Sequence, residues 1–234
     1  SREVAGQTKS VAVMRFENRS SFPENEWIGV GFSEIIATKL SLVESITLVE
    51  RLKINEVLAT AKKSDLINET QQNEAEAARS ILGVEYLLIG SVQSLGSYKD
   101  ENTKIKVSAR IIKTESAAIK GDASFTIDGT IKELFGIQTK MAAQFCRALN
   151  VDATVNELGY EEAMNITAQQ LYADGMNQLY KHEYKKAIDL FRQALNNNEG
   201  SFYSVAHTME GIARQKQIES AGANDQEKLK KEYL

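Results

Sequence analysis

The stretch VEYLLIGSVQSL, residues 84–95, decides the fold, because its apolar residues point to both faces of the strand that it predicts. A strand of this kind is covered on both sides and lies at the centre of its sheet. Two further predicted strands follow after short links, TKIKVSARIIK at 103–113 and AAIKGDASFTI at 117–127. Both alternate between apolar and polar residues, so each has one buried and one solvated face. The short links predict antiparallel hairpins.

Outward from this centre, shorter strands alternate with amphipathic helices. Strands are predicted for VAVMRF at 11–16 and SITLVE at 45–50. Helices are predicted at 31–43, 52–63, 73–83 (ending at Gly83) and 131–150. The order is therefore β-α-β-α-α-β-β-β-α. It predicts an α/β fold in which helices pack on a mixed sheet of about five strands.

After residue 151 no strand pattern remains. Residues 166–198 predict two helices joined near His182, and a further helix is predicted at 201–222. Small and aromatic residues recur here at the spacing of a tetratricopeptide repeat, namely Gly175, Tyr184, Ala187, Phe191 and Ala194. The predicted organisation is a flexible tail at 1–8, an α/β domain at 9–151, a TPR-like helical domain at 160–222 and a charged, frayed tail at 223–234.

Composition excludes several classes of protein. The net charge of −4 argues against a nucleic-acid binder, which usually has a basic excess. No apolar run reaches the roughly 18 residues that a membrane span needs. The single cysteine, Cys146, rules out an internal disulfide, and its place on the apolar side of a helical pattern predicts a buried structural thiol. The first residue is Ser1 rather than Met, which leaves open whether a leader has been removed.

The glycine pair in WIGVGFSEII, Gly29 and Gly31, suggests a phosphate-binding loop. A P-loop, however, needs a Gly-Lys-Ser/Thr end, and Ile35 and Ile36 stand there instead. A dinucleotide-binding loop needs a third glycine, where this chain has Glu34. A nucleotide-handling enzyme is therefore a third and weakest hypothesis. The favoured interpretation is a tight turn at the two glycines under the preceding tryptophan.

The sequence offers no recognisable catalytic or metal-binding cluster. His182 and His207 lie far apart and have no nearby group of Cys, His or Asp. The signatures of Ser-His-Asp and Cys-His catalysis are missing as well. The chain is therefore predicted to have no catalytic residues, no metal and no cofactor.

Four stretches resemble the TolB-like, CsgG-like and FlgO-like domains of the bacterial envelope. They are VAVMRFENRSSFPENEWIGVGFSEIIATKLS (11–41), ITLVERLKINEVLA (46–59), ARSILGVEYLLIGSV (78–92) and VSARIIKTESAAI (107–119), the last with Glu115–Ser116 where glycine is usual. The resemblance implies a mixed sheet packed by helices and a non-enzymatic role in the periplasm through protein partners. Some similar domains are fused to tetratricopeptide repeats. The pore-forming type is disfavoured, because the link from Leu95 to Thr103 is too short for extra membrane strands.

Two surfaces are candidates for partner binding. Phe22, Pro23 and Trp27 form a patch if they are exposed, and the alternative is that Trp27 packs on the sheet or the first helix. The first repeat helix supplies the other set by its spacing, namely Gln169, Tyr172, Met176, Leu179 and Tyr180. Here too, packing within the chain is the competing interpretation.

The leading hypothesis is a periplasmic or outer-membrane-associated adapter that binds a protein partner. It is exported or lipidated, with any lipid anchor upstream of this sequence, and homo-oligomerisation is left open. The alternative is a regulatory sensor module that holds a small ligand in the cleft between sheet and helix.

Overall fold

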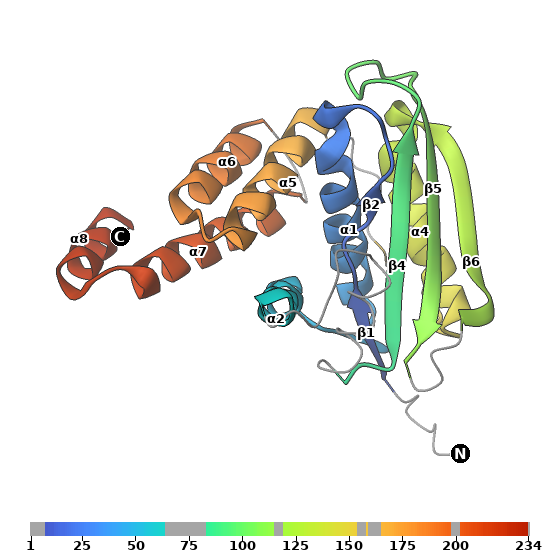
Figure 1. The fold of residues 1–234 in the computed structure, drawn as a ribbon, viewed down its shortest axis with the longest axis horizontal. Helices are drawn as coiled ribbons and strands as arrows, with labels where there is room; N and C mark the ends of the chain where they lie inside the picture. The colour runs from blue at the N-terminus through green and yellow to red at the C-terminus, as the bar shows by residue number, and fades with distance from the viewer. Residues whose placement is uncertain are drawn as a thin grey trace. The chain divides into compact units, whose positions relative to one another are not determined.

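The computed structural model describes residues 8–63, 83–114, 119–153, 158, 165–197 and 202–233 (Figure 1). The chain divides into two compact units, residues 1–161 and 162–234. The described part of the first unit holds the sheet, and that of the second is all helical.

A mixed sheet forms the centre of the first unit. Its strands are β1 (Lys9–Val13), β2 (Glu17–Asn18), β3 (Ile46–Leu48), β4 (Tyr86–Ser94), β5 (Lys104–Lys113) and β6 (Ile119–Thr130). The order is β3-β1-β4-β5-β6, with β2 beside β4. Strand β1 is parallel to β3 and β4, whereas β4, β5 and β6 are antiparallel neighbours that lie side by side in Figure 1. The predicted α/β class, the central strand and both hairpins are confirmed.

The helices of this unit cover the sheet from both sides. They are α1 (Glu26–Ser41), α2 (Arg51–Lys63) and α4 (Leu134–Ala148), with short 3-10 turns at Pro23–Asn25 and Ile131–Glu133. The predicted helix at 73–83 lies outside the described residues except for Gly83. The backbone of Gly83 has the left-handed φ of 62° that suits a glycine after a helix.

Aromatic packing covers the face of the sheet under α1 and α4. Phe16 stacks on Phe32 of α1 with ring centroids 5.2 Å apart, and Phe125 of β6 packs edge-on against Phe145 of α4 at 5.5 Å. Gly90 lies under the Phe16 ring, because a Cβ at this position would come within 2.4 Å of a ring carbon. Gly90 of β4 therefore points to the α1 side, and its neighbours in the strand point to the opposite side.

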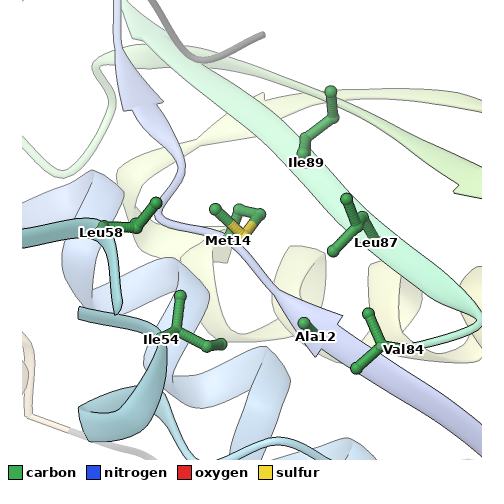
Figure 2. Packing of buried hydrophobic residues seen from close by; sticks show 7 residues of the cluster. All are labelled: Ala12, Met14, Ile54, Leu58, Val84, Leu87 and Ile89. Carbon is green, nitrogen blue, oxygen red and sulfur yellow. The ribbon is translucent and has the colours of Figure 1, made fainter. Parts of the chain in front are cut away.

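On that opposite side, α2 covers β1 and part of β4. Figure 2 shows Ile54 and Leu58 of α2 beside the side chains of both strands. The cluster comprises Ala12, Met14, Ile54, Leu58, Val84, Leu87 and Ile89. Further along the sheet, the outward residues of β5 and β6 are exposed, among them Lys106, Ser124 and Thr126. Part of the sheet therefore presents side chains to solvent.

The glycine pair does not form a turn. Helix α1 begins at Glu26, so Gly29 and Gly31 lie inside it and are buried. The prediction of a turn is therefore wrong, and the nucleotide hypothesis loses the one observation that supported it. The physical reason for Gly29 is a close backbone approach, since an added Cβ would lie 2.3 Å from the carbonyl oxygen of Phe16.

The second unit consists of α5 (Ile166–Tyr180), α6 (Tyr184–Asn196), α7 (Phe202–Ser220) and α8 (Ala223–Tyr233). Helices α5 and α6 form the predicted hairpin, and His182 takes the left-handed conformation at the turn with φ of 61°. Tyr172 packs on Phe191 with ring centroids 5.7 Å apart, and the Phe191 ring lies against Gly175. The expected frayed tail is wrong, because residues 223–233 form α8. Assignment of this unit to the tetratricopeptide class stays a prediction.

Candidate binding surfaces

A buried asparagine fixes two loops at the carboxyl end of β4. The Asn25 side chain donates to the Ser94 hydroxyl at 2.6 Å and to the Gly96 carbonyl at 2.7 Å. Its carbonyl oxygen accepts from the Tyr98 backbone N–H at 2.9 Å. Ser20, in the loop before α1, adds a further hydrogen bond: its hydroxyl accepts from the Ser94 backbone N–H at 2.8 Å. The segment before α1 is therefore tied to the turn after β4.

Replacing Asn25 with alanine is expected to lower the free energy of unfolding by about 2 kcal/mol, because the Ser94 hydroxyl, the Gly96 carbonyl and the Tyr98 N–H each lose a hydrogen bond to a buried side chain. Asn102 lies in the turn between β4 and β5 and is exposed, so Asn102→Ala serves as the matched control and is expected to stay within about 0.5 kcal/mol of the parent. Urea unfolding followed by tryptophan fluorescence measures both. Equal stability of the two variants would contradict a stabilising role for the Asn25 hydrogen bonds.

Trp27 is a packing residue and not an accessible anchor. Its side chain is buried, and its ring meets the ring of Tyr98 edge-on at 5.5 Å. Of the predicted patch, Pro23 is exposed and Phe22 is half-buried. Only these two residues of the three can contact a partner without a rearrangement of the domain.

Leu95, directly after β4, is a further exposed apolar residue of this unit, and sequence reasoning missed it. Its side chain is 71% exposed, and it lies between Ser94 and Gly96, the two residues that Asn25 binds. We call Phe22 and Pro23, before α1, together with Leu95, after β4, the apolar rim, because the Asn25 hydrogen bonds tie these two loops together. A hollow of about 570 Å³ adjoins Leu95 and is lined by Gln93, Leu95, Lys104, Ile105, Lys106, Asp128, Gly129 and Thr130. The available sequence signal was a leucine at the outward position two residues after Gln93.

The open face of the sheet continues from this hollow. It consists of outward residues on three strands, namely Ser91, Gln93, Lys104, Lys106, Ser108, Arg110, Ser124, Thr126 and Asp128. Lys106 lies 4.0 Å from Asp128, which is the one acidic member of the set. A second hollow of about 250 Å³ lies further along this face, around Arg110.

The predicted residues of the second unit are largely buried. Gln169, Tyr172, Met176 and Leu179 are each at most 2% exposed, and Tyr180 is half-buried. Residues spaced three and four apart share one face of a helix, whether that face packs in the core or binds a partner. The pattern alone therefore could not distinguish the two roles. A partner-binding role for these five residues remains a prediction.

Among the described residues of the second unit, Glu210 is a buried carboxylate that lies between two arginines. It is 3% exposed, accepts from Arg192 at 2.7 Å, and also forms an ion pair with Arg214. Burial by itself raises the pKa of Glu210, but hydrogen bonds from the two arginines outweigh it and hold the pKa below its usual range. The carboxylate is therefore occupied in a structural role.

Within the described ranges, no group of three His, Cys, Asp or Glu side chains is placed to hold a metal ion. His182 contacts the Tyr184 hydroxyl at 2.8 Å, and His207 lies 3.6 Å from Glu210. Cys146 is buried, as its helical position predicts. None of the helices that the structure describes is both long and apolar enough to cross a membrane.

Comparison with known proteins finds one distant relative by sequence and several solved structures with low similarity to this chain. No protein-family model matches the chain. The putative adenylate cyclase 3 of Rhizobium meliloti (strain 1021) is 26% identical over 148 residues, which are 63% of this chain and 22% of that protein. The chain thus spans about a fifth of the length of this relative.

Among solved structures, the LpoB C-terminal domain of Salmonella enterica has a TM-score of 0.41 at 16% identity, covering 54% of this chain and 87% of that one. Lipoprotein GNA1162 of Neisseria meningitidis has a TM-score of 0.40 at 18% identity, covering 59% and 96%. TolB of Acinetobacter baumannii has a TM-score of 0.37 at 11% identity, covering 61% and 28%.

Proposed function

We propose that this chain is a non-enzymatic adapter of the bacterial cell envelope, and that its apolar rim binds a protein partner. The observation that carries the proposal is Leu95, an exposed leucine held in place on a rigid strand end. The envelope location, periplasmic or at the outer membrane with any anchor upstream, rests on the four stretches that resemble TolB-like domains.

The rim has the properties of a binding anchor. Large apolar side chains that stay exposed beside a hollow favour association, because burial of a leucine contributes about 1.5–3 kcal/mol. The Asn25 bonds fix both loops before a partner arrives, which reduces the conformational entropy lost on binding. Lys104 and Lys106 border the hollow and supply the polar edge that protein interfaces usually have.

The test compares Leu95→Asp with Leu42→Asp in pull-downs from envelope extract. Leu42 is the matched control, because it is also an exposed leucine of this unit, at 56%, but lies at the end of α1. We expect Leu95→Asp to reduce capture of the partner at least tenfold and Leu42→Asp to leave it unchanged. Unchanged capture by a folded Leu95→Asp variant would overturn the assignment of the rim.

A regulatory sensor module is the second candidate function. The observation in its favour is the 26% identity to the putative adenylate cyclase 3 of Rhizobium meliloti. The small ligand would lie in the cleft between sheet and helix or in one of the two hollows described above, which lie on the open face of the sheet. A small ligand that raises the melting temperature would support this function, since ligands that bind only the native state stabilise it. A flat thermal-shift screen would count against it.

A further inference from the structure

We propose that the hollow around Arg110 is a binding site for the phosphate group of a small ligand. This inference goes beyond the adapter function, because the apolar rim can bind a protein whether or not the hollow is filled. It rests on the donors that three neighbouring strands bring to one place.

The strand register aligns these donors. Ser91 of β4 pairs with Ser108 of β5, which in turn pairs with Thr126 of β6. Arg110 and Ser124 form the next outward pair of the β5–β6 ladder. Adjacent strands are about 4.8 Å apart, and outward neighbours along a strand are about 7 Å apart. One oxyanion is therefore within reach of hydroxyls from several strands and of one guanidinium group.

The charges around the hollow favour an anion. Arg19 and Arg110 both line it, and no Asp or Glu does so among the described residues. Arg19 is held by Glu17 at 2.9 Å. Arg110 lines the hollow opposite Ser124, its partner in the β5–β6 ladder. Guanidinium groups bind phosphate through two parallel hydrogen bonds, and serine and threonine hydroxyls can donate to the remaining oxygens.

The size of the hollow limits the ligand. Its volume of about 250 Å³ lies below the roughly 300–1,000 Å³ of pockets that enclose a drug-sized molecule. A single phosphate group with a short substituent fits this space. The ligand class is therefore a small phosphate monoester or inorganic phosphate itself.

The test is a titration of the full chain with inorganic phosphate at constant ionic strength, followed by amide NMR shifts. We expect saturable shifts at Ser108, Arg110 and Ser124. Arg110→Gln is expected to weaken binding at least tenfold. Arg147→Gln, an exposed arginine on α4, is the matched control and is expected to leave binding unchanged. Ser124→Glu places a carboxylate beside Arg110 and is expected to abolish binding as well, which keeps the test valid if Arg110→Gln does not fold.

Non-saturable shifts, or equal weakening by Arg147→Gln, would overturn the site. Glycerol 3-phosphate and phosphatidylglycerol vesicles distinguish the sources of phosphate, and we expect Arg110-dependent binding of glycerol 3-phosphate only. Arg110-dependent sedimentation with vesicles, without binding of free phosphate, would overturn a small-ligand site. Leu95→Asp is expected to retain phosphate binding, so failure of the phosphate site can be distinguished from failure of partner binding at the apolar rim.

Discussion

Replacing Gly29 with alanine is expected to lower the free energy of unfolding of the first unit by about 3 kcal/mol or more. The added methyl group would lie 2.3 Å from the carbonyl oxygen of Phe16. A backbone oxygen cannot rotate away as a side chain can, so α1 has to shift off the sheet. That shift would also disturb the stacking of Phe16 on Phe32.

Trp27 is the chain's single tryptophan, so its fluorescence reports unfolding of this unit alone in a urea titration. Gly211→Ala is the matched control, because Gly211 also lies in a helix but has no heavy atom within 4 Å of the added Cβ. Urea unfolding followed by circular dichroism should show the Gly211→Ala variant stabilised by up to about 1 kcal/mol, because alanine has a higher helix propensity than glycine. A Gly29→Ala variant as stable as the parent would refute the close approach of α1.

Replacing Glu210 with alanine is expected to destabilise the second unit by about 3 kcal/mol, the cost of breaking a buried ion pair. Arg192 of α6 and Arg214 of α7 both bind this buried carboxylate. Arg214 also lies over the ring of Tyr233 in α8, 5.1 Å from its centroid. Loss of the carboxylate therefore removes the partner of two cations and loosens three helices, and breaking a buried ion pair in this way is strongly destabilising.

Glu227→Ala provides the control for Glu210, because Glu227 is exposed and pairs with Lys231 at 2.9 Å. Surface pairs of this kind contribute about 0–1 kcal/mol, so little change is expected. Far-UV circular dichroism during urea unfolding follows both variants. Equal effects of the two substitutions would contradict a structural role for the buried cluster.

The same cluster predicts a pH dependence. The folded pKa of Glu210 is lowered, so its contribution to stability is fully present above the unfolded pKa of about 4.3 and is lost as the pH falls through the folded pKa. We expect the parent chain to lose helicity of the second unit in acid, and Glu210→Ala to lose that part of the dependence. If the parent chain and the Glu210→Ala variant unfold over the same acid range, groups other than Glu210 control the pH dependence.

Strands and hairpins could be predicted because their signal is local. The alternation of Lys104, Lys106 and Ser108 with buried residues follows directly from the two-residue period of a strand. The start of α1 could not be read in the same way. Two glycines usually interrupt a helix, and only the distant backbone of Phe16 explains why Gly29 lies inside one.

The candidate sites were harder to predict than the fold. Phe22 and Pro23 were correctly placed in the loop before α1, but Trp27 is buried because Tyr98, more than seventy positions away, packs against it. Leu95 resembles any core leucine in the sequence, and its exposure depends on where β4 ends. The Arg110 hollow depends on the register of three strands, which no single stretch of sequence contains.

The most direct test of the central claim is photocrosslinking in the native envelope. A benzoylphenylalanine at position 95 is compared with one at position 42, the exposed leucine site at the end of α1, and with one at position 180, the half-buried tyrosine site of α5. We predict a discrete crosslinked product from position 95 and none from position 42. Absence of a product at position 95, with products from position 180 in the second unit, would contradict the rim and transfer partner binding to the helical unit.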